Sequence, residues 1–256
     1  MVNVNWYYLE LIWYNAIAEL RAEAARAYLG FFWWVFEPIL YMVAFYIVFA
    51  IVFQRGGSDF VPFLLCGLVV WKWFGSAVAF CANSIPSNSG LMSQVYLPKY
   101  LFPMIILLNS SIKFIIIFGL LVLFLLIYGV EPSASWLSLP VIILVQFLFI
   151  AFIAGLVASI VPLVPDIKLI LDNVLMLLFF LSGIFFDISV APEDVKFYLL
   201  LNPMAVLIES YRAVLIDGLW PNAMGLSLVF LGSCVGLWFV YRIFKHYDRI
   251  YPKILV

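Results

Sequence analysis

The sequence predicts an all-α integral membrane protein with six transmembrane helices, and its composition and its apolar runs carry that prediction. Hydrophobic residues make up 67% of the chain and charged residues only 11%, with a mean hydropathy of +1.18. A typical water-soluble domain carries about 25% charged residues. Several apolar runs reach the ~20 residues that cross a hydrocarbon core of ~30 Å. Because lipid offers no hydrogen bonds to the backbone, these runs are expected to be helices.

Six runs qualify as spans, and little chain remains between them for a soluble domain. In order they are Phe31–Phe53, Phe60–Cys81, Leu101–Tyr128, Leu137–Val161, Leu169–Ile188 and Ala223–Phe244. Residues 1–256 are therefore expected to form a single transmembrane domain. The cysteines lie within or at the ends of these runs, where we expect apolar packing rather than a disulfide or a metal site.

Residues 6–28 are expected to form an amphipathic interface helix that lies on the membrane before the first span. Its apolar residues recur at intervals of three and four and form one stripe: Trp6, Leu9, Trp13, Ile17, Leu20 and Ala24. Charged residues occupy the other faces, which suits the headgroup level of a bilayer. An ordinary helix packed on a soluble partner is the alternative. Leu29 and Gly30 are expected to end this helix and turn the chain into the first span.

The distribution of basic residues predicts the orientation, because lysine and arginine collect on the cytoplasmic side. With six spans both termini share one side, and that side receives most of the basic residues: Arg21, Arg26, Lys99, Lys168, Arg242, Lys245, Arg249 and Lys253. The opposite side receives only Arg55, Lys196 and Arg212. Both termini are therefore expected in the cytoplasm.

Two irregular regions interrupt the apolar runs. The cytoplasmic segment 83–100 contains two prolines and a glycine, which limit any helix there to about two turns. A shorter cytoplasmic loop, Pro162–Lys168, follows the fourth span. On the outer side, residues 189–218 predict two helices, Pro192–Leu201 and Pro203–Ile216, each beginning with a proline signal. Both are too short to cross, so a re-entrant pair before the last span is expected.

Several classes of function are disfavoured by what the sequence lacks. The single histidine, His246, lies in the tail, so one chain cannot assemble a histidine-based metal cluster or catalytic triad. No lysine follows a glycine, so a phosphate-binding Gly-x-x-x-x-Gly-Lys loop is absent from the sequence. Acids within the spans are scarce, which argues against a proton-coupled carrier. The chain is not expected to be an enzyme by itself.

Lys72 and Lys113 lie within predicted spans, and Lys113 is about 18 Å beyond Leu101 at 1.5 Å per residue. The reading of Lys113 has two alternatives. Lys113 could face a polar cavity and contact an anionic or sugar substrate, or its amine could reach the inner surface along its own stem. The two readings are equally open. Aromatic residues such as Trp71 and Trp73 could line the same channel with flat faces for sugar rings, although most aromatics should anchor the interfaces or face lipid.

The order of four motifs resembles a known family. They are LGFFWWVFEP at Leu29–Pro38, FLLCGLVVWKWF at Phe63–Phe74, NSIPSNSGLMSQVYLPKYLFP at Asn83–Pro103 and LNPMAVLIESYRAVL at Leu201–Leu215. Together they resemble the membrane (permease) subunit of type-2 ABC exporters of polysaccharide and polyol phosphate, which include O-antigen, capsule and teichoic acid transporters. The chain departs from the family pattern at Gln94 and at Pro165, where basic residues are common.

The resemblance implies an assembly and a cargo. Two copies of the chain would form a channel, and two copies of a separate ABC ATPase would dock beneath them in the bacterial inner membrane. The cargo would be a lipid-linked glycan of O-antigen type. ATP and Mg²⁺ would be bound by the ATPase, and this chain would hold no cofactor.

The resemblance also assigns roles to residues. Contacts with the ATPase would come from the segment 83–100 and the second loop, through Asn83, Asn88, Leu91, Gln94, Tyr96, Lys99, Asp166 and Lys168. The substrate would enter near Arg21, Arg26, Leu29 and Gly30 and pass Lys113, Trp71 and Trp73. The re-entrant pair in residues 189–218 would form an outer gate that includes Pro192, Asn202, Pro203, Glu209 and Arg212.

Two other functions stay open at this point. An ABC permease for drugs or lipids would be favoured by a dimer interface lined with aliphatic side chains. A secondary carrier that needs no ATPase would transport its cargo with an ion gradient alone.

Overall fold

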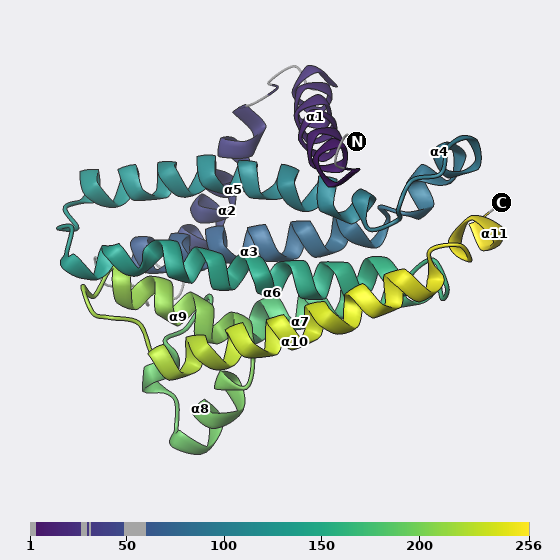
Figure 1. Ribbon diagram of the computed structural model, residues 1–256. Coiled ribbons are helices and arrows are strands. Elements are labelled where there is room, and N and C mark those ends of the chain that lie inside the picture. Colours follow the sequence, from purple (N-terminus) through teal and green to yellow (C-terminus); the bar gives the residue numbers. More distant parts are fainter. Residues whose placement is uncertain (1–3, 27–29, 31, 49–59, 256) are drawn as a thin grey trace.

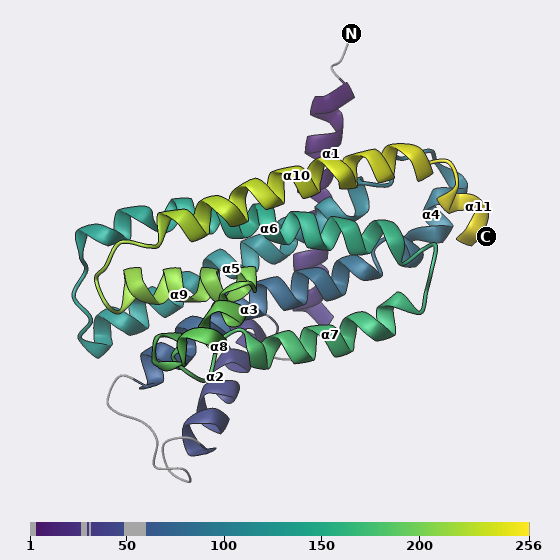
Figure 2. The same cartoon turned by 90° about the horizontal axis from the view of Figure 1, so that it is seen from below.

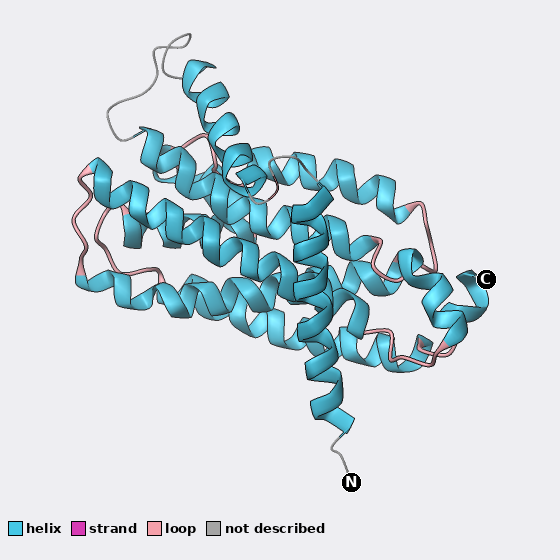
Figure 3. Ribbon diagram, turned by 90° about the horizontal axis from the view of Figure 1, so that it is seen from above, coloured by secondary structure: helices cyan, strands magenta, loops and turns pink. Residues whose placement is uncertain are grey.

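The computed structural model describes residues 4–26, 30, 32–48 and 60–255, and these residues form helices and connections without a strand. Figures 1 and 3 show the arrangement. The helices are α1 (Val4–Arg26), α2 (Phe32–Tyr46), α3 (Phe60–Ala82), α4 (Ser89–Gln94), α5 (Leu101–Tyr128), α6 (Leu139–Ile160), α7 (Ile167–Leu181), α8 (Glu193–Leu200), α9 (Pro203–Leu215), α10 (Ala223–Tyr247) and α11 (Tyr251–Leu255). Short 3-10 turns lie at Pro86–Asn88, Ala134–Ser138 and Ile188–Val190.

The long helices α3, α5, α6 and α10 form a bundle, with α9 packed into one half of it (Figure 1). α3 is the most enclosed helix, because it contacts α5, α6, α7 and α9. Its buried side chains include Leu64, Val70 and Phe74. Within the bundle Gln146 of α6 donates a hydrogen bond from Nε2 to the carbonyl of Val70, at 2.9 Å. Such a bond fixes the rotation of α6 against α3 in an apolar setting.

A seam of small residues joins α6 to α10. A methyl group added at Gly236 would come within 2.4 Å of the Phe152 ring, and one at Gly155 within 2.9 Å of Val240. Close approach of helix backbones through glycine is a common way to pack helices in lipid. The α6–α10 seam therefore depends on these glycines.

Most of the predicted spans correspond to observed helices. Four stretches are long and apolar enough to cross a membrane: Phe60–Ala82, Leu101–Tyr128, Ala134–Ile160 and Ala223–Tyr247. The predicted boundaries of these four agree with the structure to within a few residues. α2 and α7 are 15 residues long, short of the ~20 that cross a bilayer. The predicted first span ran on to Phe53, and its last part falls outside the described residues.

The fifth predicted span is wrong as a single helix. α7 ends at Leu181, well before the predicted end at Ile188. Gly183 then adopts φ +71°, a left-handed conformation that glycine reaches without strain and that ends a helix. The Ser182-Gly183 pair in the sequence carries the signal for this stop.

α1 crosses the long helices at a steep angle and packs on the face of α5 that points away from α6 (Figures 2 and 3). This is the arrangement expected of an interface helix. Its contact with α5 buries Ala16 and Leu20, whereas Trp6 and Trp13 of the predicted apolar stripe are exposed. Gly30 follows with φ +45°, in agreement with the predicted turn.

The two ends of the bundle carry different segments (Figures 1 and 2). We call the first the α4 end; it carries residues 83–100, the turn 161–166 and the C-terminal residues 248–255. We call the second the α9 end; it carries residues 129–138, 182–202 and 216–222. The three segments at the α4 end include both predicted cytoplasmic connections.

Candidate functional site

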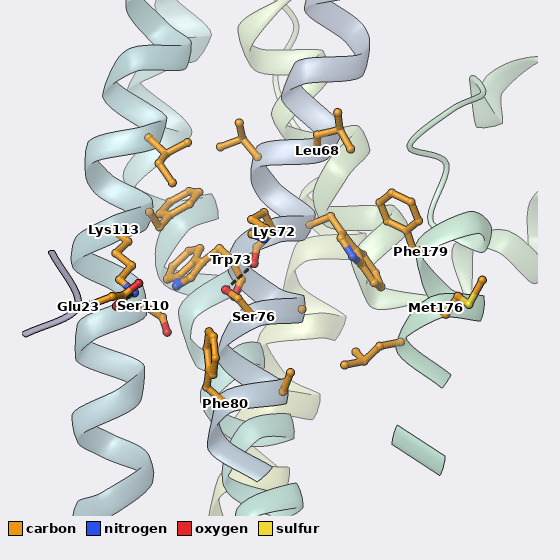
Figure 4. A pocket seen from close by; sticks show the side chains of 17 residues that line it. Glu23, Leu68, Lys72, Trp73, Ser76, Phe80, Ser110, Lys113, Met176 and Phe179 are labelled. Atoms are coloured by element: carbon orange, nitrogen blue, oxygen red, sulfur yellow. Dashed lines mark hydrogen bonds and ion pairs between the residues drawn. The ribbon is translucent and has the colours of Figure 1, made fainter. Parts of the chain in front are cut away.

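A cavity of about 580 Å³ lies between α3, α5 and α7 and reaches the C-terminal half of α1 (Figure 4). It brings together the three predicted channel residues, Lys113, Trp71 and Trp73. Lys72, Ser76 and Ser110 add polar groups to the same wall, and Phe114 and Phe179 add aromatic faces. The cavity therefore combines cationic, hydroxyl and aromatic groups in an otherwise apolar bundle.

Aromatic side chains shape two sides of this cavity. Trp73 stacks on Phe114 with ring centroids 4.0 Å apart and planes 12° apart. Trp71 lies against Phe179 of α7, with centroids at 5.7 Å. The indole Nε1 of Trp73 has no hydrogen-bond partner in the described part of the chain. A buried donor without a partner is uncommon.

Lys113 forms an ion pair with Glu23 of α1. One turn earlier on both helices, the Asn109 amide donates to the Glu19 carboxylate at 3.5 Å. Burial raises the pKa of the Glu19 carboxyl, while the bond from Asn109 and the charge of Lys113 oppose that shift. The two polar pairs attach α1 to α5, so the lysine amine is held beside the cavity rather than at the end of the bundle.

Sequence analysis missed this polar contact. It placed the charged residues of the interface helix, which include Glu19 and Glu23, on the faces away from the apolar stripe. Glu19 and Glu23 are four residues apart, and so are Asn109 and Lys113. This equal spacing, which places each pair on one face of its helix, is the signal that could have predicted the contact.

The residues predicted to receive the substrate are described only in part. Arg21 is exposed on α1, and Arg26 is the last residue of that helix. Leu29 and the side chain of Arg26 lie outside the described residues. Gly30 forms the turn between α1 and α2.

The α4 end presents the predicted coupling segment as a short helical projection. The turn Pro86–Asn88 and the six-residue helix α4 match the length limit set by the prolines and the glycine. On this projection Leu91 is 44% exposed and Gln94 is exposed, whereas Met92 is buried against the bundle. Asn83 and Asn88 are partly buried, and Asn88 donates to the Ser84 carbonyl at 2.8 Å. One face of α4 is thus available to a partner and the other is anchored.

Tyr96 and Lys99 have internal partners. The Tyr96 hydroxyl donates to Asp248 at 2.6 Å, and this bond raises the pKa of the phenol. The Lys99 side chain is only 1% exposed; its ammonium donates to the Leu97 carbonyl at 2.7 Å, and burial lowers its pKa. The predicted contact of Lys99 with a partner protein remains a prediction, but its ammonium points inward. In the second loop Asp166 is exposed and precedes α7, and Lys168 is partly buried in its first turn.

The predicted outer gate is built around the start and end of α9. Pro192 is exposed and precedes α8, whose first turn carries Glu193 and Asp194. Asn202 caps α9 as expected: its Oδ1 accepts from the Met204 amide at 3.0 Å, and Pro203 is the first helical residue. The Asn202 amide also donates to Ser182 Oγ at 2.8 Å, which ties α9 to the end of α7.

The Arg212 side chain is buried and joins α9 to two other segments of the fold. It is 5% exposed, and its guanidinium donates to the carbonyls of Phe63, Gly183 and Ile184 at 2.6–3.2 Å. The orientation count placed Arg212 among outer basic residues; the structure instead satisfies its charge within the fold. Glu209, one turn earlier, is partly buried.

Among the described residues, no group of three or more His, Cys, Asp or Glu side chains could hold a metal ion.

Comparison with known proteins places the chain in a family. The family described as ABC-2 type transporter matches residues 10–216, from α1 to the end of α9. The O-antigen export system permease protein RfbA of Myxococcus xanthus is 28% identical over 89% of this chain and 88% of its own length. RfbA of Klebsiella pneumoniae is 24% identical over 83% and 82%, and the polysialic acid transport protein KpsM of Escherichia coli is 24% identical over 86% and 87%. With a match that covers most of its length, this chain belongs to the ABC-2 type transporter family.

Proposed function

We propose that this chain is the membrane subunit of an ABC transporter that exports a lipid-linked polysaccharide, of O-antigen type, across the bacterial inner membrane. The observation that carries the proposal is the similarity, over more than four fifths of the chain, to relatives named for O-antigen export and polysialic acid transport. A separate ATPase would bind ATP and Mg²⁺ and supply the energy, and this chain would hold no cofactor.

The proposal includes six membrane crossings with both termini in the cytoplasm. α2 and α7 would cross together with the segments that flank them, in addition to the four longer helices. The excess of basic residues on the side of the α4 end supports this orientation.

The α4 end would receive the ATPase. A chain that binds no nucleotide needs a rigid cytoplasmic projection through which another protein can move it, and α4 has an exposed face and a buried, anchored one. Leu91 and Gln94 on the exposed face would make the contact, and Asp166 could add a second contact from the turn before α7.

A second copy of the chain would complete the channel. α7 has no buried residue, and its exposed apolar side chains include Leu169, Met176, Leu177 and Phe180. α8 is likewise exposed at Phe197 and Tyr198. Apolar surface on α7, which lines the cavity, and on α8 suits a homodimer contact.

The cavity would lie on the substrate path. Lys113 and Lys72 could attract the phosphate of a lipid-linked glycan, and Trp71 and Trp73 could stack against sugar rings. The substrate would enter at the α1–α2 turn, near Arg21, Arg26, Leu29 and Gly30. At the α9 end, α8 and α9 would act as the outer gate.

Deletion of Asn88–Val95 tests the proposal. The variant should insert into the membrane and fold, because most of the buried core lies outside this segment. It should fail to co-purify with its partner ATPase and fail to place glycan on the cell surface.

Two point variants separate a loss of ATPase binding from a loss of folding. Leu91→Asp alters the exposed face of α4, and Leu219→Asp places the same change on an exposed leucine at the α9 end. We expect only Leu91→Asp to weaken ATPase binding. Unchanged co-purification after both the deletion and Leu91→Asp would overturn the coupling assignment.

A further inference from the structure

The coupling segment is tied to the C-terminal end of α10 by one carboxylate. Asp248 accepts a hydrogen bond from the Tyr96 hydroxyl on Oδ2, at 2.6 Å, and one from the backbone N–H of Lys99 on Oδ1, at 2.9 Å. The partners lie 152 and 149 residues away in the sequence. Sequence analysis gave Asp248 no role.

The bond to Lys99 also places a negative charge at the start of α5. Lys99 precedes α5 by two positions, and the capping residue Tyr100 makes no side-chain hydrogen bond. A carboxylate near a helix N-terminus satisfies a free N–H and interacts favourably with the helix dipole. Asp248 therefore places a negative charge just before the start of α5, from the end of α10.

A second contact fixes the same C-terminal segment to α6. The Tyr251 hydroxyl donates to the Ser159 carbonyl in the last turn of α6, at 2.9 Å, and Tyr251 is fully buried. α11, which begins at Tyr251, packs against α4. Asp248 and Tyr251 thus join the coupling segment to the ends of three long helices, α5, α6 and α10.

The bond from Tyr96 is exposed, unlike the core of the bundle. Tyr96 is 65% exposed, so solvent competes for its hydrogen bond and the bond adds little to overall stability. The contact therefore contributes more to the position of the coupling segment than to the stability of the fold.

We propose that Asp248 is a positioning residue that latches the coupling segment to α10, so that a displacement of α4 moves α10 with it. The proposal rests on the assignment of α4 as the ATPase contact. Without the latch, α4 would still bind the ATPase but would move separately from the bundle.

Hydrogen exchange on the purified chain tests the latch without any partner. Asp248→Ala should raise the exchange rate of the Lys99 amide about tenfold, as expected when a protected amide opens locally. Amides within α6 should be unchanged. Asp248→Asn should restore part of the protection, because its amide oxygen can still accept from Lys99. Lys245→Ala, an exposed change on the last turn of α10, is the control and should alter nothing.

Distance measurement in the complex with the ATPase tests the mechanical role. Spin labels on cysteines introduced at Gln94 and Lys245 would report the α4–α10 separation, in a background with Cys234→Ser. On addition of ATP and vanadate the separation should stay constant with Asp248 present and change in Asp248→Ala. Tyr96→Phe should give an intermediate change.

The outcomes separate the two proposals. If the chain with Asp248 does not co-purify with the ATPase, the proposed function fails, and hydrogen exchange still decides whether the latch exists. If the ATPase binds and Asp248→Ala leaves both the Lys99 exchange rate and the nucleotide response of the labels unchanged, the latch is overturned. Should Asp248→Ala fail to fold, Asp248→Asn should still show a partial rise in the Lys99 exchange rate, and Tyr96→Phe should still change the nucleotide response of the labels; no change in either would overturn the latch.

Discussion

The α9 end and the α4 end of the bundle are held together by opposite kinds of contact. At the α9 end the buried guanidinium of Arg212 joins α9 to the first turn of α3 and to the residues that follow α7. At the α4 end the carboxylate of Asp248 joins α10 to a tyrosine that is mostly in solvent. Arg212 is buried within the fold, whereas Tyr96, one of the two partners of Asp248, is mostly exposed.

The neighbours of each contact reinforce the difference. Gly67 leaves room for the Arg212 guanidinium, since a methyl group there would come within 2.8 Å of Nη2. The Phe63 ring packs against its face at 3.3 Å. The contacts of Asp248 instead lie in the segment that follows α4, where Tyr96 is exposed. The buried contact of Arg212 should therefore cost more to break than the exposed contact of Tyr96.

Arg212→Ala should produce the largest loss of stability, because it removes the buried contact at the α9 end. It leaves three carbonyls in an apolar setting without their donor, and each unsatisfied group costs about 1–3 kcal/mol. We expect a loss of about 3 kcal/mol or more in the free energy of unfolding, measured by chemical denaturation in detergent. Arg242→Ala, on the exposed face of α10, is the control and should cost less than about 1 kcal/mol. Equal losses in both variants would remove the distinction between the ends.

Asn202→Ala should give the second largest effect, about 1–2 kcal/mol, because it removes the cap of α9 and the bond to Ser182 together. Asn222→Ala is a matched comparison, since Asn222 caps α10 in the same way but is exposed. Asn222→Ala should cost about 1 kcal/mol. Ser182→Ala removes the bond between Asn202 and Ser182 but leaves the cap of α9, so its loss of stability should equal the difference between the losses of Asn202→Ala and Asn222→Ala. A smaller loss for Asn202→Ala than for Asn222→Ala would contradict the tie between α9 and α7.

Glu23→Gln tests the polar contact between the ends, where α1 meets α5. The ion pair with Lys113 is partly exposed, so its loss should cost about 1 kcal/mol or less. Glu10→Gln, on the exposed start of α1, should have no effect. A double-mutant cycle with Lys113→Gln should give a coupling energy of about 0.5–1 kcal/mol. A coupling energy of zero would mean that α1 is held on α5 by apolar contact alone.

Tyr96→Phe should have the smallest effect on unfolding, within about 0.5 kcal/mol, since the hydroxyl is exposed and water replaces its partner. Its effect on motion at the α4 end is a separate matter that unfolding does not measure. A loss as large as that of Arg212→Ala would show that the two ends do not differ in kind.

Local signals in the sequence predicted much of the fold. The 28 residues of α5 were predicted at their observed bounds, the two-turn limit on α4 was correct, and Asn202 caps α9 as its position before a proline indicated. These features depend on residues that are neighbours in the chain. The early end of α7 also had a local signal, Ser182-Gly183, which an apolar run of the right length obscured.

Long-range partners could not be predicted in the same way. Nothing in the sequence near Arg212 indicates that its donors meet the carbonyl of Phe63, 149 residues away. Asp248 and its partner Lys99 are also 149 residues apart in the sequence. The cavity is an intermediate case: Lys113, Trp71 and Trp73 were selected by their depth and type, and the structure brings them together.

Cysteine labelling from each side of the membrane tests the central claim, that the α4 end faces the cytoplasm. Gln94→Cys and Leu219→Cys are exposed sites at the two ends, and Cys234→Ser removes the exposed native thiol. We predict that an impermeant maleimide labels Gln94→Cys only in inverted vesicles and Leu219→Cys only in intact spheroplasts. Labelling of Gln94→Cys in intact spheroplasts would contradict the account, because α4 would then lie beyond the reach of any ATPase.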